Sequence, residues 1–342
     1  MKLKKLKKIF VWGIFFGGFA AAAAIIGYDT FYGNAVKEDT SIYITPQTDY
    51  KTLCSKTESI ITTPLKVRAF SFYASHLNLE GRIKTGHYRI EKGMSVIKIT
   101  RKFVLGEQTP INLVVGNART LPQIASKLSK QLMADSTALI SVMYDKSVRE
   151  SLGYKKDSLI AMFIPNTYSV YWNISPKQLL QRMKKESQAF WNDSRKAKLA
   201  AANLTEYQAM TLASIVYEET KNRGEMPRIA GVYMNRLKKN RPLQACPTVK
   251  YAMGDFSLTR ILHRHLRYDS PFNTYRNAGL PPAPICIPSL AAIDAVLNYE
   301  KSHYLYFCAK PEFDGTHNFA RTLREHNANS RKYNEALKRL KK

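Results

Sequence analysis

An uncharged run of 20 residues near the N-terminus constrains this chain more than any other feature. It extends from Ile9 to Tyr28. At 1.5 Å per helical residue, a run of this length spans about 30 Å, the hydrocarbon thickness of a bilayer. Residues 1–8 (MKLKKLKK) carry five lysines, and such residues stay on the cytoplasmic side of a membrane. We therefore expect a cytoplasmic tail at 1–8 and a transmembrane helix at 9–28.

This topology places the rest of the chain outside the cytoplasm, as a single-pass protein of the inner (cytoplasmic) membrane. A cleaved signal peptide is the alternative, because Ala20–Ala24 could supply a small-residue cleavage site. The apolar run continues through Ile25 and Ile26, beyond the point where cleavage would fall. That continuation favours an uncleaved anchor.

The charge balance is strongly basic and restricts the partners. The sequence holds 53 Lys and Arg against 26 Asp and Glu, for a formal net charge of +27. Such a field attracts polyanions, among them nucleic acid, an anionic membrane surface, or an acidic polysaccharide or peptide mesh. An extracytoplasmic body argues against nucleic acid, so we expect no nucleic-acid partner.

The body divides into a small module and a larger domain, which fits the roughly two domains expected for 342 residues. We expect a linker at 29–45, a small α+β module at 46–115 and a mixed, helix-rich domain at 116–342. The overall class is therefore α+β.

Within the small module, two segments carry clear patterns. Gly86–Gly93 alternates like a strand that ends in a turn, and Met94–Leu105 has the apolar spacing of a short amphipathic helix. Ser59–Thr63 and Val67–Ser71 are expected to be extended, and Phe72–Leu79 to be helical.

One helix of the larger domain carries a buried acid. Thr205 and Gln208 form a capping box that starts this helix. Glu218 falls on its more polar face, in line with other polar residues. Glu219 instead continues the apolar stripe, which runs through Leu212, Ile215 and Val216.

A carboxylate on an apolar stripe is costly to keep ionised, so burial raises its pKa and lets it hold a proton near neutral pH. That property suits a general acid. A structural role is the alternative: Glu219 could lie at a frayed helix end, or pair with Arg223 or Arg228.

Two later segments, Leu243–Tyr251 and Ser270–Pro284, combine polar and aromatic residues, and the second is a loop rich in Pro, Gly, Asn and Thr. Such loops could supply hydrogen bonds and a ring face to a sugar, and they could equally be ordinary loops. The histidines show no metal-binding spacing, so we expect no metal and no cofactor; the ones considered are His263, His265, His317 and His326.

Several motifs, in one order, make the chain resemble the YceG-like family of endolytic murein transglycosylases. They are ASIVYEET (213–220), IAGVYMNRL (229–237), LQACPTVKY (243–251), SPFNTYRNAGLPP (270–282), HNFARTLREHN (317–327) and IPNTY (164–168). The segment around Gly86–Gly93 resembles the LysM-like module that precedes the catalytic domain in this family.

The resemblance implies that Glu219 is the catalytic acid, because Tyr217 occupies the position of the family's other glutamate in this motif. Two further family acids are replaced, by Cys246 and Asn166, so no second carboxylate is available from these positions. The implied reaction is lytic cleavage of MurNAc–GlcNAc bonds in nascent strands, which leaves 1,6-anhydroMurNAc ends and terminates strand elongation.

The same resemblance suggests the residues and partners of the site. The candidates for positioning the glycan are Asn235, Gln244, Thr248, Asn273 and Tyr275. The implied partners are peptidoglycan glycan strands, the membrane and peptidoglycan synthases. A non-catalytic peptidoglycan-binding scaffold of the cell-wall synthesis machinery is the alternative function. Whether Cys246 and Cys286 form a disulfide stays open.

Overall fold

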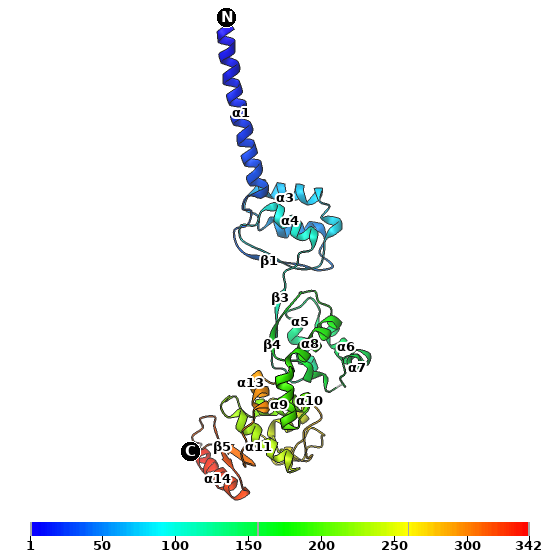
Figure 1. The fold of residues 1–342 in the computed structure, drawn as a ribbon, viewed down its shortest axis with the longest axis vertical. Coiled ribbons are helices and arrows are strands. Elements are labelled where there is room, and N and C mark those ends of the chain that lie inside the picture. Colours follow the sequence, from blue (N-terminus) through cyan, green and yellow to red (C-terminus); the bar gives the residue numbers. More distant parts are fainter. Residues whose placement is uncertain (1, 156, 259, 341–342) are drawn as a thin grey trace. The chain divides into compact units, whose positions relative to one another are not determined.

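The computed structural model describes residues 2–155, 157–258 and 260–340 (Figure 1). The chain forms two compact units, and the residues of each unit pack mainly against one another. Unit 1 consists of Met1–Asn112 and Ser169–Ile174, and unit 2 of Leu113–Tyr168 and Ser175–Lys342. The chain first passes between the units close to the predicted start of the larger domain at 116. Nothing in the sequence pattern predicts that Ser169–Ile174 returns to unit 1.

The N-terminal helix α1 runs from Lys2 to Tyr32 and contains the predicted apolar run. Its segment Phe10–Tyr32 is long and apolar enough to cross a membrane, and it is the one such segment among the described residues. None of the apolar window is covered by the rest of the chain. The predicted helix is therefore confirmed, and it continues beyond Tyr28. The end of α1 is tied to unit 1, because Phe31 packs against that unit's core.

Unit 1 is a small α+β body built on one antiparallel strand pair. In this pair, Ile42 of one strand is opposite Tyr88 of the other. Its core contains Leu53, Phe70 and Phe103, none of which is exposed. The elements are β1 (Thr40–Ile44), α2 (Tyr50–Glu58), α3 (Pro64–His76), the short 3-10 helix η1 (Glu80–Arg82), β2 (Gly86–Ile90) and α4 (Val96–Leu105).

The predicted strand at 86–93 and the predicted helix at 94–105 are confirmed as β2 and α4. The extended segment predicted at Val67–Ser71 is wrong, since these residues lie inside α3. Thr63 caps this helix and Pro64 occupies its first turn, two local signals that outweigh the β-branched Val67. The LysM-like identity of the module stays a prediction.

Unit 2 is mostly helical and contains a short antiparallel strand pair, of β5 (Tyr306–Ala309) with β6 (His317–Ala320). Strands β3 (Ile111–Val115) and β4 (Asn166–Val170) also pair with each other, and along each of them the chain passes from one unit to the other. The helices are α5 (Leu121–Ser129), α6 (Ser136–Tyr144), α7 (Lys146–Ser151), η2 (Leu159–Met162), α8 (Pro176–Phe190), α9 (Asp193–Ala202), α10 (Glu206–Glu219), α11 (Met226–Lys238), α12 (Cys246–Met253), η3 (His265–Arg267), α13 (Leu290–Leu297) and α14 (Leu323–Leu340).

Helix α10 is the central element of unit 2. It packs against α9, α11, α12 and α13, and its residues 209–216 are buried without interruption. The predicted capping box is present: the Thr205 side chain accepts a hydrogen bond from the Gln208 N–H, and the Gln208 side chain accepts one from the Thr205 N–H. The cap fixes where α10 begins, and the helix ends where Thr220 turns to an extended backbone (φ −143°).

All four cysteines lie among the described residues, and each is a free thiol. Cys286 is buried, with its Sγ 3.7 Å from the Ser214 carbonyl oxygen. Cys246 lies beside Tyr275 instead. The structure therefore contains no Cys246–Cys286 disulfide.

Candidate active site

Glu219 is the last residue of α10, and its carboxylate meets a tyrosine from the neighbouring helix. Tyr233 of α11 donates a hydrogen bond from its hydroxyl to Glu219 Oε1 over 2.8 Å. The ring of Tyr233 is 1% exposed and packs edge-on against Phe307 of β5. Two consecutive helices and a strand from much later in the chain therefore fix the position of this carboxyl group.

Burial raises the pKa of Glu219 to about 7, because the protein around the carboxyl disfavours its charged form. The neighbouring Glu218 carboxylate raises this pKa further. The hydrogen bond from Tyr233 and the positive charge of Lys250 act in the opposite direction. Near neutral pH the group therefore populates both protonation states, as a residue that gives and then takes a proton requires.

The described residues show no ion pair between Glu219 and a basic side chain. Arg228 pairs with Glu300 at 2.8 Å, and Glu218 on the polar face pairs with Arg119 at 2.7 Å. The alternative in which Glu219 neutralises Arg228 is therefore not realised.

A cavity of about 320 Å³ opens beside Glu219, and Glu219 is the one acidic residue in its lining. Most of the wall is aromatic, amide or apolar, which suits an uncharged, hydroxyl-rich ligand. The cavity is lined by Glu219, Tyr233, Arg236, Leu243, Gln244, Cys246, Tyr275, Tyr306, Phe307, Leu323 and His326.

Two of the five predicted glycan-positioning residues line this cavity. Gln244 has a left-handed backbone (φ +52°), and its side-chain oxygen accepts a hydrogen bond from Arg236 at 3.0 Å. That bond occupies the oxygen of the amide and leaves the NH₂ group for a ligand. The Tyr275 hydroxyl lies 3.2 Å from Cys246 Sγ.

The other three predicted residues do not line the cavity, because their side chains hold backbone in place. The Asn235 amide donates to the carbonyl oxygens of Ser302 and Tyr304 at 2.8 and 2.9 Å. Thr248 is fully buried and donates to a carbonyl one turn earlier in the chain, and the buried Asn273 donates to two carbonyls of residues 266–268. These contacts hold the backbone of the loops next to the cavity.

Arg236 is a structural residue of the site that the sequence pattern did not single out. It is 9% exposed, and its Nε donates to the Leu305 carbonyl at 2.6 Å. Its Nη1 donates to the carbonyls of Pro242 and Leu243 and to the Gln244 side chain, at 3.0–3.2 Å. Arg236 thus joins the end of α11 to the loop before α12 and to the start of β5. Arg236 lies in the IAGVYMNRL motif, and this position is the one sequence signal that could have identified it.

Of the histidines considered for a metal, only His326 lines the cavity. Burial and the positive charge of Arg236 lower the pKa of His326, which keeps the ring neutral at physiological pH. His317 instead lies 2.9 Å from Glu225. Among residues 2–155, 157–258 and 260–340, no group of three His, Cys, Asp or Glu is arranged to hold a metal ion.

Comparison with known proteins defines the class. Residues 42–332 match the YceG-like family, so this chain belongs to that family, as the motifs predicted. A crystal structure of a yceG-like protein from Listeria monocytogenes shares its fold, with a TM-score of 0.57 and 27% identity. The match covers 85% of this chain and 98% of that one.

Two curated relatives carry the name endolytic murein transglycosylase. The protein from Bacillus subtilis (strain 168) is 30% identical over 282 residues, which cover 78% of this chain and 77% of the relative. The protein from Streptococcus pneumoniae serotype 2 is 30% identical over 295 residues. These cover 76% of this chain and 52% of that longer relative.

Proposed function

We propose that this chain is a membrane-anchored endolytic murein transglycosylase, with Glu219 as its one catalytic acid and base. Family membership and the names of the relatives support the reaction class. The observation that carries the proposal is a lone carboxyl group, with its pKa raised to about 7, on the wall of a cavity of about 320 Å³.

In the first step, protonated Glu219 donates its proton to the glycosidic oxygen between MurNAc and GlcNAc. The bond from C1 of MurNAc to this oxygen breaks, and positive charge develops on the MurNAc ring. Tyr233 occupies Oε1 of the carboxyl, so Oε2 is the oxygen that would face the substrate. The hydroxyl of Tyr233 also stabilises the carboxylate that the proton transfer leaves behind.

In the second step, the Glu219 carboxylate accepts the proton of the MurNAc C6 hydroxyl while O6 attacks C1. The new bond closes the 1,6-anhydro ring, no water is consumed, and Glu219 regains its proton. A hydrolase of the common type needs a second carboxylate to hold the attacking water or to form a covalent intermediate. The lining of this cavity offers no such partner, which favours the intramolecular attack.

Gln244 and Tyr275 are the residues we propose to contact the glycan directly. Asn235, Thr248 and Asn273 then contribute indirectly, by holding the loops that carry these contacts. Arg236 orients the Gln244 amide so that its NH₂ group is available to a sugar hydroxyl or acetamide oxygen.

We further propose that α1 anchors the enzyme, with the lysine-rich tail cytoplasmic and the body outside. The length of Phe10–Tyr32 and the five preceding lysines support this topology. An anchor of this kind keeps the active site close to strands as they emerge from the membrane, where cleavage would terminate elongation. Peptidoglycan synthases are the partners this location suggests.

The test is product analysis by mass spectrometry after digestion of peptidoglycan with the full-length protein. We expect 1,6-anhydroMurNAc ends from the wild type. Glu219→Gln should lower their rate of formation about a hundredfold to ten-thousandfold, the range for loss of a general acid. Glu312→Gln, at an exposed carboxylate on the β5–β6 connection, is the matched control.

Free reducing ends in place of anhydro ends would identify a hydrolase and contradict the proposal. If Glu219→Gln retained full function in cells, the non-catalytic scaffold would be favoured instead.

A further inference from the structure

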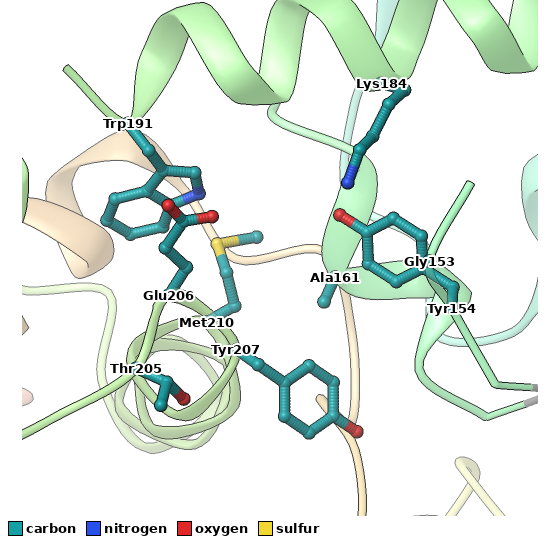
Figure 2. Close-up of a pocket in the computed structure, with 9 residues that line it drawn as sticks. All are labelled: Gly153, Tyr154, Ala161, Lys184, Trp191, Thr205, Glu206, Tyr207 and Met210. Carbon is teal, nitrogen blue, oxygen red and sulfur yellow. The ribbon is translucent and has the colours of Figure 1, made fainter. Parts of the chain in front are cut away.

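Unit 2 contains a second cavity, of about 310 Å³, at the opposite end of α10 from Glu219 (Figure 2). The reaction proposed above does not use it. The cavity lies between the start of α10, the helix α8 and the segment around η2. It is lined by Gly153, Tyr154, Ala161, Lys184, Trp191, Thr205, Glu206, Tyr207 and Met210.

The deepest lining residues of this cavity are apolar. Ala161, Trp191 and Met210 are 5%, 2% and 1% exposed, so little of each reaches solvent. The Trp191 ring is therefore almost fully covered and does not offer an open face on which a sugar could stack. A short aliphatic segment fits against such a surface better than a pyranose ring does.

Two opposite charges border the apolar surface from different elements. Lys184 projects from α8 toward Tyr154, with its Nζ 4.6 Å from the ring centroid, and Glu206 projects from the first turn of α10 (Figure 2). Among the described residues, neither Lys184 nor Glu206 forms an ion pair or a side-chain hydrogen bond. The tyrosine next to Glu206 is held in place, since the Tyr207 hydroxyl donates to the Pro282 carbonyl.

An apolar surface between a free ammonium and a free carboxylate is complementary to a ligand that carries both charges on an aliphatic chain. We propose that this cavity binds a short peptide segment with a free carboxylate and a free ammonium group. Lys184 would contact the carboxylate and Glu206 the ammonium. This inference rests on the proposed function, because the peptide stems of peptidoglycan are the peptides that such an enzyme would meet.

The position of the cavity gives the contact a consequence for the reaction. Helix α10 has 14 residues, so its two ends are about 20 Å apart at 1.5 Å per residue. A stem of three residues spans only about 10 Å when fully extended, so a stem bound at Glu206 would not belong to the sugar cleaved at Glu219. The bound stem would belong to a sugar further along the same strand or on a neighbouring strand.

The test uses a synthetic probe and isothermal titration calorimetry on the full-length protein in detergent. The probe is N-acetyl-Ala-Gln-Lys, in which the C-terminal carboxylate is the one acidic group and the ε-ammonium is the one basic group. Two capped forms, the C-terminal amide and the ε-N-acetyl derivative, each lack one charge. We expect the uncapped probe to bind about two- to fivefold more tightly than either capped form, as one solvent-accessible ion pair allows.

Variants assign each charge to its partner. Lys184→Met should abolish the preference for the carboxylate and keep the preference for the ammonium, and Glu206→Gln should do the reverse. Lys185→Met, at an exposed neighbour on α8, should leave both preferences intact. Because each variant keeps one preference, a fold defect would be recognised by the loss of both, with thermal melting as a check.

Equal affinity for all three probes would overturn the proposal, as would a carboxylate preference that survives in Lys184→Met. The measurement is independent of cleavage. If the anhydro products form and the charge preferences are absent, this inference alone fails. If the preferences are present and no anhydro products form, the proposed reaction fails and the binding site stands.

Discussion

At the scale of single residues, the sequence identifies Glu219 and the fold supplies its partner. The apolar stripe of α10 predicts that this carboxyl is desolvated, and burial does raise its pKa to about 7. No spacing rule links it to Tyr233, which lies on the next helix and contacts it only because α10 and α11 pack together. The hydrogen bond from Tyr233 limits the rise in pKa that burial causes.

This pair predicts a specific pH dependence. A general acid must be protonated, so kcat/KM for anhydro product should fall about tenfold per pH unit above a midpoint near 7. The Tyr233 hydroxyl stabilises the carboxylate and so lowers the pKa. Tyr233→Phe should therefore raise the pKa and move the alkaline limb to higher pH. Rates measured from pH 5 to 10 would show the shift.

Tyr171→Phe is the control, because Tyr171 is an exposed tyrosine of unit 1. An alkaline limb that stays in place in Tyr233→Phe, or that moves to lower pH, would contradict the assigned role of the hydroxyl.

At the scale of helices and strands, local signals fixed the elements that carry strong caps. The capping box of α10 was predicted and is present. The Pro at the start of α8 is a second local signal of this kind. The pair β5 and β6 has no comparable signal, yet β5 supplies Tyr306 and Phe307 to the wall of the cavity. Short strands of four residues depend on their partner, so sequence periodicity cannot reveal them.

Close packing of α11 gives a prediction at this scale. A Cβ added at Gly231 would lie 2.3 Å from the backbone carbonyl oxygen of Glu300. The Glu300 N–H in turn donates to the Pro227 carbonyl at 2.9 Å, which limits how far this oxygen can move. Gly→Ala in a helix ordinarily stabilises by about 1 kcal/mol. Here we expect Gly231→Ala to destabilise by about 1–3 kcal/mol through overpacking.

The measurement is urea unfolding followed by far-UV circular dichroism. Gly224→Ala is the matched control, because its added Cβ would meet only the side chain of Asn222, at 3.3 Å, and should be near neutral. A stabilised Gly231→Ala would mean that the loop at Glu300 yields easily and that α11 is not held as tightly as these contacts indicate.

At the scale of the whole molecule, the apolar segment of α1 and the folded body are separable. The described residues of α1 up to Tyr28 make no contribution to either core, while Thr30 and Phe31 are packed against unit 1. The cavity beside Glu219 lies entirely within unit 2, whose core is built from α10, α11 and α13. Removal of the anchor should therefore change location without changing chemistry.

Deletion of residues 1–28 tests this separation. We expect the full-length chain in the membrane fraction and the shortened chain in the soluble fraction. Both should form anhydro ends at similar rates, within about twofold, on soluble glycan. The readouts are fractionation with immunoblotting and the product assay above. A shortened chain that stays in the membrane fraction, or that folds normally but loses activity on soluble glycan, would argue that α1 does more than anchor.

The sequence by itself determined the features that depend on neighbours within a few residues. These are the apolar run at 9–28, the capped helix with Glu219 on its buried stripe, and the motifs of the YceG-like family. Only the tertiary structure decided which polar residues face the cavity. Asn235 and Gln244 look equally suited in the sequence, yet Asn235 donates to carbonyls 67 and 69 residues away while Gln244 lines the site. Periodicity describes one helix at a time, whereas the partners of a side chain come from segments that only packing brings together.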